Sequence, residues 1–387
     1  GCGMHEPVVH GFQLATRLLF GNDAVCALGK EAKKYGEKVL LVTGRSGLEK
    51  AGILSRIIGI LKDSGLQVIL FNQVEPEPSL ATVVKGMELF RQNNLEVVIA
   101  VGGGSAIDAG KAIAGLVNAQ APPEDYFYGR ELERKGYPFV AVPTTAGSGA
   151  EVTINSVLIH NNIKQSIRSQ YLAADLALVD PVLTLHLPQH ITAYTGMDAL
   201  VQALEAYTSK GSGPLTDIYA VEAILQLLAN LPAAYTNGDN LQARRAVSLA
   251  SLMSGIALTN ARLGAVHGLA HSVGRISQKP HGLVCAVLLP YVMRFNLAVC
   301  YEKYAAIIHK INPPTRNEDP IDTAAMLIKQ VMALKKRLAI PERLRELGIE
   351  KSDFARIIEE SKNSGSLKAN PREASEQDLV NILEESW

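Results

Sequence analysis

The sequence has few cysteines, no excess of charge of either sign and no long run of apolar residues. The four cysteines stand far apart without a CxxC spacing, which argues against a disulfide framework and against a cysteine zinc site. We therefore interpret all of them as ordinary thiols in a reducing cytoplasm: Cys2, Cys26, Cys285 and Cys300. The 38 acidic side chains balance the 38 basic ones, so nucleic acid is not expected as a partner.

No uninterrupted apolar run is long enough to cross a membrane, and the first residues lack the basic and apolar regions of a signal peptide. We therefore expect a cytoplasmic protein with no membrane partner. The 387 residues, of which 47% are hydrophobic, are enough for two domains with substantial cores.

Short β-branched runs alternate with amphipathic stretches in the first half of the chain. The runs are continuously apolar, as in strands of a parallel sheet that is covered on both faces, and span residues 39–43, 68–71, 97–101, 139–142 and 177–180. Between the first three lie helical patterns near residues 47–64 and 80–94. This alternation predicts a doubly wound α/β domain whose ligand binds at the carboxyl ends of the strands.

Two loops follow such strands and are candidates for binding a dinucleotide. Residues 102–111 read GGGSAIDAGK and lead into a helix, so glycines would let the backbone approach a pyrophosphate at the helix start. The dinucleotide fingerprint is matched only in part, and such turns also occur for structural reasons. Residues 143–151, PTTAGSGAE, offer hydroxyls that would hold phosphate oxygens or a carboxamide, or else cap the next helix. The predicted cofactor residues of the two loops are Gly102, Gly103, Gly104, Ser105, Asp108, Thr144, Thr145 and Ser148.

The end of the first predicted strand bears on the choice between NAD and NADP. An acidic residue there would accept a hydrogen bond from the adenosine ribose, whereas this chain reads Gly44-Arg45-Ser46. The glycine leaves room, Arg45 brings positive charge and Ser46 supplies a donor, which favours the extra phosphate of NADP. The alternative is that Arg45 is a solvated turn residue.

Long helical patterns rich in Ala and Leu follow residue 185, in stretches 192–209, 215–235, 240–260 and 284–309. They predict an all-helical second domain. We place the boundary in the proline-containing segment 181–188, which gives an α/β domain over residues 1–185 and a helical domain over residues 186–387.

Histidines gather in one helical stretch of the second half, GAVHGLAHSVGRISQKPHG at residues 264–282. His267 and His271 are four residues apart and share one face of a helix, and a Lys-Pro pair would end that helix and leave His281 on a loop. Asp198, Gln202 and Glu205 share a face of an earlier helix. These side chains are either ordinary buried hydrogen-bonding sets or, with Asp198 facing the histidines, a mixed oxygen and nitrogen site for Fe(II), Zn(II) or Mn(II).

Taken together, the motifs resemble those of the iron-containing, or group III, alcohol dehydrogenases over nearly the whole chain. The matching segments are GGGSAIDAGK at 102–111, PTTAGSGAE at 143–151, TGMDAL at 195–200, EAY at 205–207, HGLAH at 267–271, PHG at 280–282 and NPR at 370–372. The resemblance implies a Rossmann-like NAD(P) domain and a helical metal domain in a dehydroquinate synthase-like architecture. It also implies a cleft between the domains for a small alcohol or aldehyde, and a homodimer or larger assembly.

Carried over by position, the family's metal ligands fall on Asp198, His267 and His281, and its non-ligand histidine, assigned to substrate binding or proton relay, falls on His271. Typical members have a further ligand histidine four residues after the aspartate, where this chain has Gln202. An amide oxygen is a neutral and weaker donor than imidazole, so the resemblance leaves two outcomes, a weakened Fe(II) or Zn(II) site and no metal at all.

The activity expected from this resemblance is hydride transfer between NAD(P) and a small alcohol or aldehyde. One alternative is a metal-independent NAD(P)H reductase of the same superfamily, similar to maleylacetate reductases, which the loss of a ligand histidine favours. A more distant alternative is a nucleotide-binding protein without catalytic activity, because a shared fold does not guarantee activity.

Overall fold

The computed structural model describes residues 8–387 of the chain, so Cys2 lies outside the described residues. The chain divides into two compact units. The α/β unit holds residues 15–199 and 226–255, and the helical unit holds residues 8–14, 200–225 and 256–387.

A parallel sheet forms the centre of the α/β unit. Its strands, in chain order, are β1 (Arg17–Phe20), β2 (Lys38–Gly44), β3 (Gln67–Val74), β4 (Val97–Gly102), β5 (Phe139–Pro143) and β8 (Leu176–Val179). Across the sheet they run in the order β1-β8-β5-β4-β2-β3, and every neighbouring pair is parallel. The five predicted strands are confirmed.

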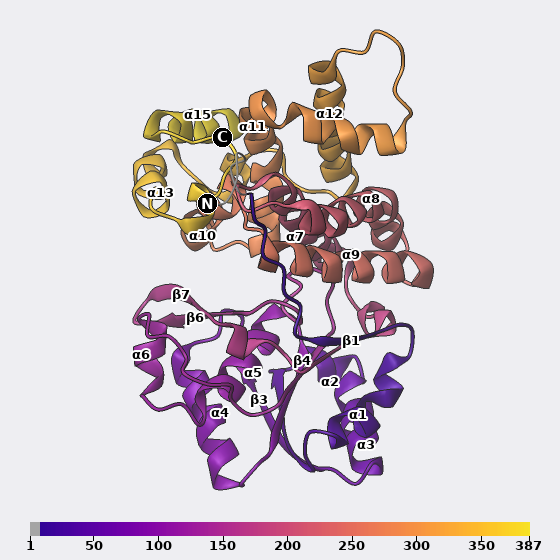
Figure 1. The fold of residues 1–387 in the computed structure, drawn as a ribbon, viewed down its shortest axis with the longest axis vertical. Helices are drawn as coiled ribbons and strands as arrows, with labels where there is room; N and C mark the ends of the chain where they lie inside the picture. Colours follow the sequence, from indigo (N-terminus) through magenta and orange to yellow (C-terminus); the bar gives the residue numbers. More distant parts are fainter. Residues whose placement is uncertain (1–7) are drawn as a thin grey trace, which may run out of the picture. The chain divides into compact units, whose positions relative to one another are not determined.

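Helices cover both faces of this sheet, as Figure 1 shows for α1 to α5. Alternate strand residues point to opposite faces, so Leu40 and Val42 join one core with α4 (Leu80–Gln92) and α5 (Gly104–Leu116). Val39 and Leu41 join the other, with the 3₁₀ turn before α1 (Leu28–Lys33) and with α3 (Ile53–Asp63). The continuous apolar runs are therefore explained by burial on both faces, and the doubly wound α/β prediction is confirmed.

Three strands lack the continuous apolar signal and were not predicted. The short β1 lies at the edge of the sheet and is only partly buried. The strands β6 (Asn155–His160) and β7 (Ile163–Arg168) form a separate antiparallel hairpin. Its two loop residues, Asn161 and Asn162, have positive φ angles of 51° and 62°, as a tight hairpin turn with a right-handed twist requires.

The predicted helical pattern at 47–64 is interrupted. It forms α2 (Gly47–Lys50) and α3, because Gly52 adopts a left-handed conformation with φ 74° just before α3. A short helix, α6 (Pro123–Phe127), precedes β5.

Helices make up the rest of the chain, as predicted. They are α7 (Gln189–Thr208), α8 (Pro214–Thr236), α9 (Leu241–Asn260), α10 (Ala265–Ser277), α11 (His281–Ile311), α12 (Pro320–Arg337), α13 (Phe354–Ser361), α14 (Gly365–Lys368) and α15 (Glu376–Ser386). Within the helical unit, α11 packs against α10, α12 and α15, and α10 also contacts α13 and α14. The all-helical character of the second half is therefore confirmed.

The segment 226–255, which includes most of α9, groups with the sheet rather than with the later helices. One close contact shows why: a Cβ atom on Gly149, in the loop after β5, would lie 2.7 Å from the Cα atom of Gly255. The single domain boundary at residues 185/186 stays a prediction.

Two helices among the described residues, α8 and α11, are long and apolar enough to cross a membrane by length and composition alone. A third such span results if the bent pair α9 and α10 is counted as one. In α11, 72% of the apolar stretch is buried inside the protein, against 39% in α8. Packing in the helical unit therefore accounts for most of the apolar surface of α11.

Candidate active site

The order of the strands locates a ligand-binding edge in the α/β unit. Strand β3, which follows β2 in the chain, pairs with one edge of β2, and the next strand, β4, pairs with the opposite edge. Ligands of doubly wound sheets bind where the strand order reverses, at the carboxyl ends of the strands. Here those ends are Gly44, which Arg45 and Ser46 follow at exposed positions, and Gly102.

The glycine loop after β4 is built for close approach to the start of α5. Gly102 has φ 152°, a conformation that favours glycine, and the helix cap is Gly103, whose position offers no side chain to bond the first amides. The N–H groups of the first turn of α5 are therefore available to an anion such as a pyrophosphate.

The second predicted loop lies beside the first. Strand β5 pairs with β4, and the Thr144 N–H donates to the Gly102 carbonyl over 2.9 Å. A Cβ atom on Gly103 would lie 3.5 Å from Thr145, and one on Gly104 would lie 2.8 Å from the Ser148 hydroxyl. The structure thus brings the two loops together, while cofactor binding by their residues stays a prediction.

Asp108 has contacts of a structural kind. Its carboxylate accepts a hydrogen bond from the Val157 N–H over 3.1 Å and lies 3.8 Å from the Lys111 ammonium. Burial raises the pKa of Asp108 and lowers that of Lys111, and the ion pair opposes both effects. A role of Asp108 in binding the cofactor stays a prediction.

Lys111 fastens the second loop and β6 to α5, a role that the sequence analysis missed. Its completely buried ammonium donates to the carbonyls of Ala150, Thr153 and Asn155 over 2.8–3.0 Å. A lysine one turn after Asp108 in the GGGSAIDAGK motif was the available signal.

In the helical unit, Glu205 on α7 holds the start of α10. Its carboxylate accepts from the backbone N–H groups of Val266 over 2.9 Å and His267 over 3.2 Å. The Ala265 N–H donates to the Asn370 side chain over 3.1 Å. Gly264 is needed here because a Cβ atom would lie 2.6 Å from the Glu205 carboxylate. The start of α10 is thereby fixed against α7.

The same carboxylate also orients the ring of His267. The His267 Nδ1 atom lies 2.6 Å from Glu205 Oε1, and both side chains are buried. A carboxylate accepts the Nδ1 hydrogen, so the neutral ring keeps its lone pair on Nε2. This carboxylate–histidine arrangement is typical of histidines that bind metals.

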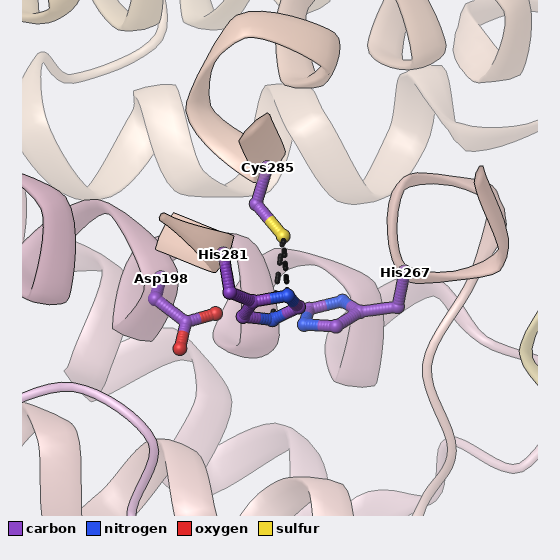
Figure 2. Close-up of side chains that lie close together, drawn as sticks. All are labelled: Asp198, His267, His281 and Cys285. Atoms are coloured by element: carbon purple, nitrogen blue, oxygen red, sulfur yellow. Dashed lines mark hydrogen bonds between the residues drawn. The ribbon is translucent and has the colours of Figure 1, made fainter. Parts of the chain in front are cut away.

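His267 is one of four side chains that are able to bind a metal and that lie close together. One ligand atom from each of Asp198, His267, His281 and Cys285 lies within 4.8 Å of the other three (Figure 2). The ring centroids of His267 and His281 are 5.3 Å apart. One oxygen, two nitrogens and one sulfur make a mixed donor set that suits a borderline divalent ion such as Zn(II) or Fe(II). The group therefore fits a metal site.

Asp198, a member of the group, and Gln202 lie on one helix, α7. The division between the two units falls inside α7, after Ala199, and both side chains are buried, one turn apart on its continuous backbone. Of the four predicted ligands, the structure places Asp198, His267 and His281 in the group. Coordination by any of them, and by Gln202, stays a prediction.

His281 does not lie on a loop, so that expectation was wrong. The Lys279-Pro280 pair does end α10, but Pro280 caps the next helix and His281 is the first residue of α11. Proline and the residue after it are well suited to the start of a helix, which explains the error.

Cys285 is the member of the group that the sequence analysis missed. It is buried on α11, four residues after His281, and its Sγ atom lies 3.5 Å from His281 Nε2. The interpretation of Cys285 as an ordinary thiol did not anticipate its place in this group. The His-x₃-Cys spacing, which places both on one helical face, was the signal.

His271 lies one turn after His267 on α10 and is exposed. It is not a member of the four-residue group. An exposed imidazole is in contact with solvent protons, which is compatible with a relay, and that role stays a prediction.

Comparison with known proteins identifies the family of both halves of the chain. The sequence model of the iron-containing alcohol dehydrogenase family matches residues 15–181, and the model of the family's C-terminal domain matches residues 192–387. The chain is 36% identical over 362 residues to the NADPH-dependent butanol dehydrogenase of Clostridium saccharobutylicum, covering 90% of this chain and 91% of that protein. It is 33% identical over 378 residues to the NAD-dependent methanol dehydrogenase of Bacillus methanolicus, covering 96% and 98%.

A solved structure gives the same result. The crystal structure of a 1,3-propanediol oxidoreductase superposes with a TM-score of 0.95 at 36% identity, over 98% of this chain and all of that one. Both halves of the sequence and the whole fold therefore agree, and the chain belongs to the iron-containing alcohol dehydrogenase family of oxidoreductases that act on alcohols.

Proposed function

We propose that this protein is an NAD(P)-dependent, metal-assisted alcohol dehydrogenase or aldehyde reductase that acts on small substrates. The observation that carries the proposal is that Asp198, His267 and His281 lie close together and that Glu205 orients the ring of His267. Family membership alone is compatible with lost activity. An oriented ligand set is a feature that chemistry at this site would need.

The cofactor residues in this proposal are those of the two loops at the strand ends. The amides of Gly103, Gly104 and Ser105 would hold the pyrophosphate, and the hydroxyls of Thr144, Thr145 and Ser148 would provide further donors. When bound, the nicotinamide ring exchanges a hydride with the carbon that carries the substrate oxygen. Arg45 and Ser46 at the end of β2 favour NADP over NAD, because the guanidinium would pair with the extra phosphate.

Asp198, His267 and His281 would hold the divalent ion, with Gln202 as a further, weaker donor. When bound, the ion supplies Lewis-acid polarisation of the substrate oxygen, where negative charge develops during aldehyde reduction. Glu205 accepts the Nδ1 hydrogen of His267, which leaves the ring lone pair on Nε2, and it fixes the ring plane. His271 exchanges the proton of the alcohol group between its imidazole and solvent.

Gln202 favours a second candidate, a reductase that works without a metal and polarises the carbonyl with histidine and basic side chains. The Gln202 side chain stands where typical iron-containing alcohol dehydrogenases have a ligand histidine. Retention of Asp198, His267 and His281 in one group argues against this candidate. The homo-oligomeric state and the cytoplasmic location, which rest on the resemblance and on the sequence composition, are further parts of the proposal.

A substrate panel tests the proposed activity. Purified protein is incubated with small alcohols plus NADP or NAD, and with the matching aldehydes plus NADPH or NADH, while absorbance of the reduced nicotinamide is followed. We expect turnover of at least one alcohol and aldehyde pair, with a higher kcat/KM for NADP or NADPH than for NAD or NADH. Tight NADPH binding with no turnover across the panel would instead identify a nucleotide-binding protein without catalytic activity.

A further inference from the structure

Cys285 lies where a metal ligand would be useful. It shares the first two turns of α11 with His281, and its Sγ atom lies 3.5 Å from Nε2 and 4.0 Å from Nδ1 of that ring. The side chain is completely buried, while His281 is exposed. Figure 2 shows the sulfur pointing toward the two histidine rings.

The spacing of these atoms agrees with coordination. A tetrahedral ion with bonds of about 2.0–2.3 Å holds its ligand atoms about 3.3–3.7 Å apart. The distance of 3.5 Å between Cys285 Sγ and His281 Nε2 falls within that interval. The upper limit of 4.8 Å for the whole group requires only a small contraction by side-chain rotation when an ion binds.

Charge and donor strength point the same way. With Gln202 as the fourth donor, the single carboxylate of Asp198 would leave a divalent ion with one positive charge that its own ligands do not balance, at a site where Asp198 and Cys285 are buried. A thiolate supplies the second negative charge, and it is a stronger and softer donor than an amide oxygen. Cys285 thus compensates for the histidine that the chain lacks at position 202.

We propose that Cys285 is a thiolate ligand of the ion held by Asp198, His267 and His281, in place of an imidazole at position 202. The inference rests on the metal site of the proposed function. It narrows the metal to a borderline divalent ion that accepts sulfur, such as Zn(II), Co(II) or Fe(II), in preference to the harder ions Mn(II) and Mg(II). The competing structural role is a weak S–H···N hydrogen bond from Cys285 to His281, which gives sulfur no part in metal binding.

X-ray absorption at the zinc edge tests the inference on the unaltered full-length protein. Zinc-loaded protein should show one sulfur neighbour at about 2.3 Å together with nitrogen and oxygen neighbours. Stoichiometric zinc with only nitrogen and oxygen neighbours would overturn the role of Cys285 and leave the proposed dehydrogenase standing. Protein that binds no divalent ion would overturn both this inference and the proposed metal site.

Two variants give an independent spectroscopic test. Cobalt-loaded protein should absorb in the near ultraviolet through sulfur-to-cobalt charge transfer, and Cys285→Ser should abolish the band while lowering zinc affinity at least about 10-fold. The matched control is Cys300→Ser, a second buried cysteine on the same helix, about 22 Å further along its axis. We expect the control to keep the band. A band that survives in Cys285→Ser contradicts the inference, and circular dichroism verifies that both variants are folded.

Discussion

At the scale of single residues, Glu205 connects the backbone of α10 to the chemistry of His267. One carboxylate accepts from two backbone N–H groups and from the imidazole Nδ1. It therefore sets the position of the helix start and the orientation of the ring with one side chain. Outer residues of this kind typically change metal affinity by about 10–100-fold when they are altered.

We predict that Glu205→Gln weakens metal binding by about 10–100-fold and lowers kcat, with little change in the KM for the nicotinamide cofactor. The amide keeps one acceptor oxygen, so it cannot serve the backbone and the ring as the carboxylate does. Metal affinity is measured by competition with a chelator, and steady-state kinetics separate kcat from KM.

The control for this prediction is Glu360→Gln. Glu360 also bonds to α10, but through Ser272 and Arg275, which lie in the second half of that helix rather than at its start. We expect wild-type metal affinity in this control. Equal losses in both variants would show that the effect is general weakening of α10 rather than orientation of His267.

Sequence patterns at the residue scale located the histidines and Asp198 but not the way they are held. The spacing of four between His267 and His271 suggested that both face one site, yet only His267 joins the group, while His271 is exposed. Cys285 was missed because its spacing of four from His281 indicates a ligand role only once Asp198 and His267, which are more distant in the chain, are seen beside it. Such contacts are a property of packing and cannot be deduced from local spacing.

At the scale of elements, the loop after β5 is fastened to α5 by buried charges. Lys111 donates to three carbonyls of this loop and β6, and Glu151 is buried at the end of the loop. Burial raises the pKa of Glu151 to about 7, although its own backbone amide and Lys111 act in the opposite direction. The carboxyl group is therefore largely protonated below neutral pH in the folded protein.

This raised pKa predicts a pH dependence of stability. The folded state holds the Glu151 proton up to about pH 7, whereas an unfolded glutamate loses it near its ordinary value, so stability from this group is complete below about pH 4.5 and is lost as the pH rises through 7. Glu151→Gln removes this titration. Its stability relative to wild type should rise between pH 5 and pH 8, by on the order of 2–3 kcal/mol, and then level off.

Urea unfolding of both proteins at several pH values measures this difference, and subtraction of the two curves cancels the other titrating groups. A difference in unfolding free energy that stays constant from pH 5 to pH 8 would show that Glu151 ionises normally in the folded protein. Any constant offset reports only the packing change caused by the amide.

The strands show why some elements were predictable and others were not. Strands β2, β4 and β5 are buried on both faces, so burial imposes runs of Val, Leu, Ile and Ala that are visible in the sequence. β7 reads IKQSIR and is largely exposed, so its pairing with β6 is specified by the Asn161-Asn162 turn rather than by an apolar run.

At the scale of the whole molecule, alternation of strands and helices followed by helices alone was sufficient to predict the fold class. The assignment of residues 226–255 to the α/β unit was not visible, because it depends on close approach of α9 to the loop carrying Gly149. The family relationship explains why both halves of the chain keep this arrangement, and the strand-end loops and the histidine group are where function is expected to reside.

Metal removal is the direct test of the proposed role of a divalent ion, held by Asp198, His267 and His281, in assisting hydride transfer. The rate of NADPH oxidation with a small aldehyde is measured on chelator-stripped protein before and after anaerobic addition of Zn(II) or Fe(II). We predict that stripping lowers the rate by at least about 100-fold, equivalent to about 3 kcal/mol of transition-state stabilisation, and that added metal restores it. Equal rates in the stripped and reloaded samples would contradict a catalytic role of the metal and identify a reductase that works without one.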